Sequence, residues 1–254
     1  DLAFEASNVA LHPGLAQAQV NSLSFSEASG LHLTQLAFDL KVEDNALSLA
    51  NLEVETGKSS VKGSLSVSYP SIAEALNSPE TSVFDLDIAE MGINVSDAFI
   101  FQPVLAENKY LVALAEQKLS GHFQLTGSLA DLKVNDALIN WGDETTLSWN
   151  GALKNVLDVQ HLQFTAAPFT FKTKRADVLK FISEDELGVA VPTTITLDLT
   201  ANGELDESTI LANLTTPDGR INVNGKFSNK EQLSFAADID VKELRLGKLL
   251  KSDQ

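Results

Sequence analysis

The stretch that decides the fold is Leu233-Ser234-Phe235-Ala236-Ala237-Asp238-Ile239-Asp240-Val241, in which apolar residues alternate with small or acidic ones. Successive side chains of a β-strand point to opposite faces. This spacing therefore predicts a strand that carries Leu233, Phe235, Ile239 and Val241 on one face. The acidic residues Asp238 and Asp240 fall on the other face. One face of the expected strand is apolar and the other is polar.

The same alternation occurs upstream, in the stretch that begins at Ile195 and continues through Leu197 and Leu199. Turn signals at Asn202-Gly203, Asp218-Gly219 and Asn229 separate the segments, because these residues favour tight turns between strands. Residues 193–241 are therefore expected to form an array of antiparallel strands.

Composition and charge exclude some classes of function. The chain has 254 residues, of which 44% are hydrophobic, and it can bury a core. Its net charge of −17 argues against a nucleic-acid partner, because phosphate binding depends on clustered Lys and Arg. The same charge disfavours electrostatic docking on anionic headgroups, but it does not oppose contact with lipid tails.

The chain lacks cysteine, which excludes disulfides and thiolate chemistry and leaves the redox compartment open. No apolar run reaches the roughly 18–20 residues that span a bilayer. The sequence opens on a strand-like pattern without an initiator Met or a signal peptide. We therefore expect it to be a mature or excised portion of a longer protein.

The first third of the chain predicts an antiparallel meander over residues 1–70. The alternation slips between Leu33 and Leu36 and again between Leu49 and Leu52, as a β-bulge or tight turn would require. Ser71 followed by Glu74 predicts a capped short helix, which Pro79 ends. A strand over residues 83–88 and a short helix over 96–107, interrupted at Pro103, are expected next.

The remaining strands are expected over residues 119–127, 132–140, 145–151 and 156–165, with Phe169 and Phe171 on one face of a further strand. Short helices are expected over 176–182 and 243–250. The fold class is therefore all-β with a few short helices, in one continuous segment 1–254. A division into sub-units 1–95, 96–182 and 183–254 fits the helical interludes.

Signatures of catalysis or metal binding do not occur in the sequence. The four histidines, at positions 12, 32, 122 and 161, stand apart from one another, and no zinc-protease, phosphate-loop or nucleophile-elbow pattern is present. The acidic stretches 142–144 and 183–186 lack the alternating oxygen ligands of a calcium loop, so we expect solvated turns there. We predict no enzyme, no metal and no cofactor.

Several short motifs resemble the TamB and AsmA-like family of translocation and assembly module proteins, in the form found in Bacteroidota. They are the stretches 23–36, 47–60, 97–105, 127–132 and 244–250, which occur in the order this family shows. The resemblance implies an elongated, curved antiparallel sheet, described as a β-taco or repeating β-groove, with an apolar inner face. It implies no catalytic residue.

The resemblance also implies a periplasmic segment of a protein anchored in the inner membrane outside this chain. Such a segment would bind or conduct phospholipid through its acyl chains and support outer-membrane assembly, with a BamA-like barrel as an expected partner. The expected groove-lining residues are Leu147, Trp149, Phe169, Phe171, Ile195, Leu197, Leu199, Leu233, Phe235, Ile239 and Val241.

Two alternatives stay open at this point. An antiparallel sheet normally packs its apolar face on its own core, so a filled sandwich or barrel competes with an open groove. The second alternative is a structural or glycan-binding β-sandwich module of the cell envelope, in which Trp141 and Trp149 would stack on sugar rings.

Overall fold

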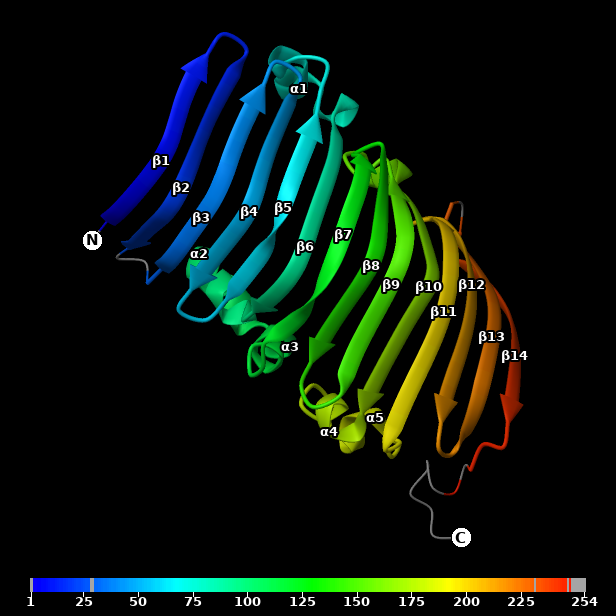
Figure 1. The fold of residues 1–254 in the computed structure, drawn as a ribbon. Helices are drawn as coiled ribbons and strands as arrows, with labels where there is room; N and C mark the ends of the chain where they lie inside the picture. The colour runs from blue at the N-terminus through cyan, green and yellow to red at the C-terminus, as the bar shows by residue number, and fades with distance from the viewer. Residues whose placement is uncertain (1, 28–29, 231, 246, 248–254) are drawn as a thin grey trace. The chain divides into compact units, whose positions relative to one another are not determined.

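The computed structural model describes residues 2–27, 30–230, 232–245 and 247. Within them, fourteen strands follow one another in sheet order, and each is hydrogen-bonded to its neighbours in sequence (Figure 1). The expected class, all-β with a few short helices, is confirmed. The chain divides into two compact units, Asp1–Asn135 and Asp136–Gln254, and each is described by itself.

The first unit contains strands β1 (Leu2–His12), β2 (Leu15–Ser26), β3 (His32–Glu43), β4 (Ala46–Thr56), β5 (Ser60–Ser68), β6 (Val83–Ile93) and β7 (Leu119–Ser128). Helix α1 (Ile72–Asn77) connects β5 to β6, and helices α2 (Ala98–Phe101) and α3 (Lys109–Leu114) lie between β6 and β7. Single turns of 3-10 helix flank them at Pro79–Thr81, Val95–Asp97 and Pro103–Glu107. Strand β8 spans Asp131–Trp141.

The sequence predicted the irregularities of this unit well. The β3–β4 register shifts between Leu33 and Gln35, and the β4–β5 register shifts between Leu49 and Leu52, so both expected slips are bulges. The Ser71 hydroxyl accepts a hydrogen bond from the Glu74 N–H at 3.2 Å and caps α1. Helix α2 ends before Pro103, as expected.

An apolar row crosses the first unit. Its members are Leu40, Leu49, Leu65, Leu86 and Leu125, which lie directly opposite one another on adjacent strands from β3 to β7. Cross-strand neighbours of this kind stabilise a sheet through side-chain contact. The predicted two-sided sheet is therefore present in the first unit as well.

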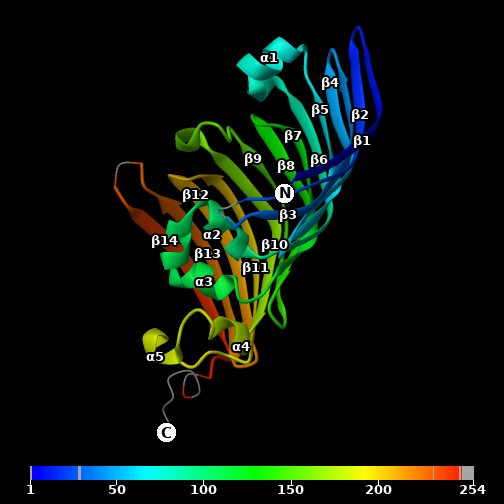
Figure 2. The ribbon, with the colours of Figure 1, turned by 90° about the vertical axis from the view of Figure 1, so that its left-hand side faces the viewer.

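The second unit contains β9 (Thr145–Lys154), β10 (Gln163–Lys174), β11 (Thr194–Glu204), β12 (Glu207–Thr216), β13 (Gly219–Ser228) and β14 (Ser234–Lys242). A single 3-10 turn at Val159–His161 precedes β10, and helices α4 (Arg175–Val178) and α5 (Glu184–Leu187) lie between β10 and β11. Figure 2 shows both helices at one end of these strands, which are bent along their length.

The prediction of a strand over 156–165 is wrong, because most of this stretch is a turn. The Asn155 side-chain amide donates to the His161 carbonyl at 3.0 Å, and the His161 N–H donates to the Asp158 carbonyl at 3.0 Å. Polar side chains of this kind compete with strand pairing for backbone groups. Strand β10 therefore begins only at Gln163.

Two further expectations differ from the structure. Asn202-Gly203 is not a turn but part of β11, where Gly203 faces β12 so closely that a Cβ would lie 2.6 Å from the Ser208 Cα. The helix expected over 176–182 is shorter, because α4 ends at Val178. Asp218 lies in the predicted turn before β13. Half of the helix expected over 243–250 lies outside the described residues, and residues 243–245 are not helical.

Among the described residues, no helix is long and apolar enough to cross a membrane.

Candidate apolar binding face

The strand register of the second unit aligns the apolar residues in two rows across six strands. The first row is Leu147, Phe171, Leu197, Leu214, Ile221 and Val241; the second is Trp149, Phe169, Leu199, Ala212, Val223 and Ile239. Ile195, Leu233 and Phe235 continue the alternation on the same side. We call this surface the apolar face.

All the residues expected to line a groove therefore lie on one face of one unit. Those on β9, β10 and β11 are half-buried, whereas those on or next to β14 are exposed. Phe235 is 65% exposed and Ile239 is 61% exposed. Strand β14 ends the sheet order, so among the described strands its side chains have a neighbouring strand on one side only.

Sequence reasoning did not include the residues of β12 and β13 in this face. Leu214, Ile221 and Val223 complete both rows between β11 and β14. The alternation that could have placed β12 on this face is present in Ile210-Leu211-Ala212-Asn213-Leu214. It is interrupted by Leu211, an apolar residue that points to the opposite face.

The opposite face of the same strands is polar. One row across it consists of Thr170, Asp198, Asn213, Asn222 and Asp240. A hollow of about 730 Å³ lies between this row and the neighbouring Thr200, Asn224 and Asp238. The two faces of the sheet therefore differ in chemistry, although the exposed Leu211 lies on the polar face and also lines the hollow.

The indole of Trp149 reaches Gly151 on its own strand. A Cβ at Gly151 would lie 2.5 Å from the indole Nε1 of Trp149, so the absence of a side chain at Gly151 permits this position. The indole nitrogen is buried without a hydrogen-bond partner among the described residues. An indole nitrogen without a polar partner fits a position on the apolar face better than a role in polar recognition.

The segment between β10 and β11 folds over one end of the apolar face. We call residues 175–192, which include α4 and α5, the cap segment. Its two ends meet, because the Arg175 N–H donates to the Thr193 carbonyl at 3.1 Å. The cap segment is therefore a closed loop with a fixed base.

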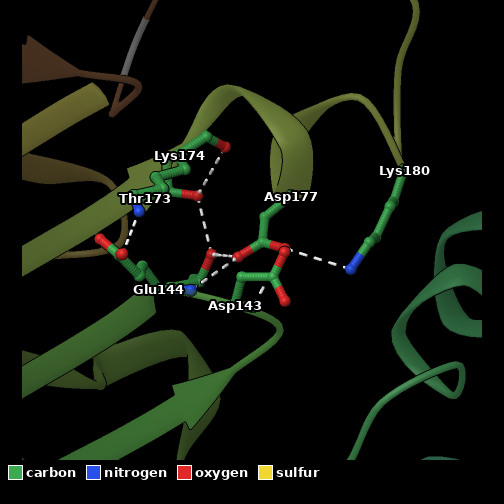
Figure 3. Close-up of polar contacts among 7 residues, drawn as sticks. Asp143, Glu144, Thr173, Lys174, Asp177 and Lys180 are labelled. Carbon is green, nitrogen blue, oxygen red and sulfur yellow. Dashed lines mark hydrogen bonds and ion pairs between the residues drawn. The ribbon is translucent and has the colours of Figure 1, made fainter. Parts of the chain in front are cut away.

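Asp177 anchors the cap segment to the turn between β8 and β9 (Figure 3). Its side chain is 1% exposed. Its carboxylate accepts hydrogen bonds from the Asp143 and Glu144 N–H groups at 3.3 Å and from the Thr145 hydroxyl at 2.7 Å. The Lys180 ammonium lies 3.2 Å from the same carboxylate. Stretch 142–144 is the exposed turn that was expected, and its backbone N–H groups also bind the Asp177 carboxylate.

The electrostatics of Asp177 follow from these contacts. Burial alone would raise the pKa of its carboxyl, but hydrogen bonds from Thr145, Lys180 and the backbone of Glu144 and Asp143 lower it by more. The resulting pKa lies below the usual Asp value. Asp177 is therefore ionised at neutral pH, although it is buried.

A second contact closes the cap segment internally. The Glu184 carboxylate lies 2.7 Å from Arg175 Nη2 and accepts a hydrogen bond from the Val191 N–H at 2.9 Å. The Ser183 hydroxyl caps α5 in a reciprocal capping box with Glu186. Stretch 183–186, expected to be a solvated turn, is therefore the ordered start of α5.

An apolar cavity of about 370 Å³ lies between the cap segment and the sheet. The cap segment contributes Val178, Ile182 and Val191 to its lining, and the sheet contributes Ile195, Leu214 and Ile221. The sheet residues belong to the apolar face, so the cavity lies at one end of that face.

The two tryptophans do not form an exposed pair. Trp141 is 4% exposed and packs on Phe181, with ring centroids 4.9 Å apart, while the Lys180 ammonium lies 4.9 Å from the Trp141 ring. Trp141 thus supports the cap segment and cannot stack on a sugar ring.

The histidines do not gather at one place. His32 Nδ1 lies 2.9 Å from the Ser26 hydroxyl, and His161 Nδ1 lies 2.7 Å from the Asp158 carboxylate. The hydrogen bond that the imidazole donates to the Asp158 carboxylate raises the pKa of His161. Across the part of the chain that the structure describes, no group of three or more His, Cys, Asp or Glu side chains could hold a metal ion.

Comparisons with protein-family models, curated proteins and solved structures found no match to this chain.

Proposed function

We propose that this chain is a non-enzymatic segment that binds or conducts phospholipid by laying acyl chains on its apolar face. The observation that carries the proposal is the pair of apolar rows across β9–β14, whose side chains stay half-buried or exposed. A contiguous apolar surface of this kind marks an interaction site in most proteins.

The driving force is the removal of hydrocarbon from water. Each buried methylene group contributes roughly 0.8 kcal/mol, so even a partial contact along one acyl chain supplies several kcal/mol. Binding also removes apolar surface of the protein from water, because Phe235, Ile239 and Val241 are exposed in the structure. Both surfaces therefore favour the contact.

The polar groups are arranged for tail contact rather than headgroup recognition. The apolar rows contain no charged side chain, and the acidic and amide side chains point to the other face. With a net charge of −17, the chain gains no electrostatic attraction to anionic headgroups. Tail binding would leave the headgroup outside in water.

The resemblance to the TamB and AsmA-like family supports the setting of this proposal. On that basis the segment acts in the periplasm, within a protein anchored in the inner membrane, and supports outer-membrane assembly with a BamA-like barrel as partner. The motifs quoted above are the support for this setting.

The test is lipid bound to the purified chain. The protein is purified from cells, and its lipids are extracted and identified by mass spectrometry. We expect phospholipid with the unmodified chain and at least a tenfold loss with Leu197→Glu, which introduces a charge in the middle of the apolar face. Thr196→Glu is the matched control, because Thr196 lies one residue away and faces the polar side.

Phospholipid retained by Leu197→Glu at the level of Thr196→Glu contradicts the proposal. So does an unmodified chain that carries no lipid after purification from cells and takes up none from phospholipid vesicles.

A further inference from the structure

The cavity under the cap segment differs from the rest of the apolar face, because it is covered on two sides. Cap residues Val178, Ile182 and Val191 lie over the sheet residues Ile195, Leu214 and Ile221. Elsewhere on the face the same rows continue to the exposed side chains of β14. The apolar face thus has an open part and a covered end.

The lining of the cavity is suited to hydrocarbon and to little else. Thr216 is its one lining residue with a polar side chain. The hydroxyl of Thr216 already donates to the Gly219 carbonyl at 3.1 Å and accepts from the Asp218 N–H at 3.1 Å. No polar lining side chain is left to orient a headgroup.

The charged groups around the cap segment are engaged with one another. Lys180 pairs with Asp177, Arg175 with Glu184, and Lys174 with Glu144. A free fatty-acid carboxylate at the cavity would have to displace one of these carboxylates. The uncharged end of an alkyl chain needs no such exchange.

The size of the cavity fits one chain. A cavity of about 150 Å³ holds one benzene ring, so one of about 370 Å³ has room for roughly twelve chain carbons. Two chains side by side would not fit. The volume therefore matches the distal part of a single acyl chain.

The cavity is continuous with the rows that would hold the rest of that chain. Leu214 lies directly opposite Leu197, and Ile195 lies two residues from Leu197 on the same face. A chain that lies along β11 and β12 would therefore reach the cavity with its methyl end while its ester end stays on the open part of the face.

We propose that the cavity under the cap segment is a receptor for the methyl end of a single acyl chain. This inference rests on the proposed function, because the rest of the chain lies on the apolar face. It adds the orientation of the bound acyl chain, whose methyl end lies under the cap segment and whose ester end lies away from it. Asp177 is a positioning residue in this account, since it holds the cap segment in place.

The experiment uses the 254-residue chain and two photoreactive phosphatidylcholines in vesicles. One carries a diazirine at the methyl end of an acyl chain, and the other carries it next to the ester. Labelled residues are mapped by peptide mass spectrometry. We expect the methyl-end probe to label Val178, Ile182 or Val191, and the ester-end probe to label residues of the open face such as Trp149 and Phe169.

A filling variant tests the cavity directly. Ala190 lines the cavity from the cap segment, and Ala190→Phe should reduce methyl-end labelling of the cap at least fivefold while labelling of Trp149 and Phe169 persists. The matched control is Ala176→Phe, since Ala176 is exposed on α4 and does not line the cavity. The control should label like the unmodified chain.

The outcomes separate the two proposals. Labelling of the open face by both probes, with none on the cap residues, overturns this inference and leaves the proposed function intact. Equal labelling of the cap by both probes, or unchanged labelling in Ala190→Phe, also overturns it. A chain labelled by neither probe overturns the proposed function together with the inference.

Discussion

Leu197 of β11 lies directly opposite Leu214 of β12, and the pair occupies the middle of an apolar row that runs from Leu147 to Val241. Both side chains are half-buried. The described strands all belong to one sheet. In a sandwich such a pair would pack against a second sheet, and the described strands form none. The energetic role of the row can be tested with single substitutions.

The two faces of β12 should respond differently to the same substitution. Leu214→Ala should lower the free energy of unfolding by about 1–2 kcal/mol, below the full cost at a buried site because Leu214 is half-buried. Leu211→Ala is the matched control, since Leu211 lies on the polar face and is 54% exposed, and it should cost less than about 0.5 kcal/mol. Urea denaturation measures both. Equal losses would show that the faces are not distinct.

Asp177 should be the most sensitive acidic residue of the cap segment. Asp177→Asn removes the charge that accepts hydrogen bonds from Thr145, Lys180 and two backbone N–H groups. We expect a loss of about 2–3 kcal/mol in the free energy of unfolding. Asp143→Ala is the control, because Asp143 is exposed and contributes its N–H. A loss in Asp143→Ala as large as in Asp177→Asn would contradict the assignment.

The stability of the cap segment should depend on acid pH. The pKa of Asp177 is lower in the folded chain than the usual value of about 3.9. A lowered pKa means that the stabilisation is complete above about pH 4 and is lost as the pH falls through the folded-state pKa. The protection of the Asp143 and Glu144 amides, measured as their hydrogen exchange relative to the intrinsic rate at each pH, should therefore fall below pH 4. In Asp177→Asn this pH-dependent step should be absent, and its persistence would assign it to another group.

His161 should titrate above its usual pKa. The Asp158 carboxylate accepts a hydrogen bond from its ring and raises the His161 pKa above 6.5. NMR titration of the imidazole protons measures this value directly. The matched change is Asp158→Asn, after which the His161 pKa should return toward 6.5; a value unmoved by the substitution would show that Asp158 is not the cause. Any stabilisation from this pair is present at low pH and lost as the pH rises through the His161 pKa.

Much of the fold could be predicted from the sequence, because alternation reports directly on which face a side chain occupies. The bulges near Leu33 and Leu49 were visible as slips in that alternation. The strand over 156–165 was predicted wrongly, since its apolar residues outweighed the turn-forming Asn155 and Asp158. Gly203 was misassigned because a glycine required by close strand packing resembles one required by a turn.

The candidate site was predictable in part. The residues of the apolar face could be placed on one side of their strands, but the sequence could not say which strands pair or that Leu214 and Ile221 complete the rows. The role of Asp177 was missed, because its partners lie more than thirty residues earlier in the chain. The residue in the sequence that could have pointed to this contact is Gly142. Glycine readily adopts the φ of 65° that the turn around the carboxylate requires.

The central claim is that hydrocarbon binds to one face of the sheet and not to the other. The most direct test places a benzophenone side chain at Leu197 or at the adjacent Asp198, which face opposite sides of β11. After irradiation with radiolabelled phospholipid vesicles, we expect strong lipid cross-linking from position 197 and at least tenfold less from position 198. Equal cross-linking from both positions, or none from position 197, would contradict the account.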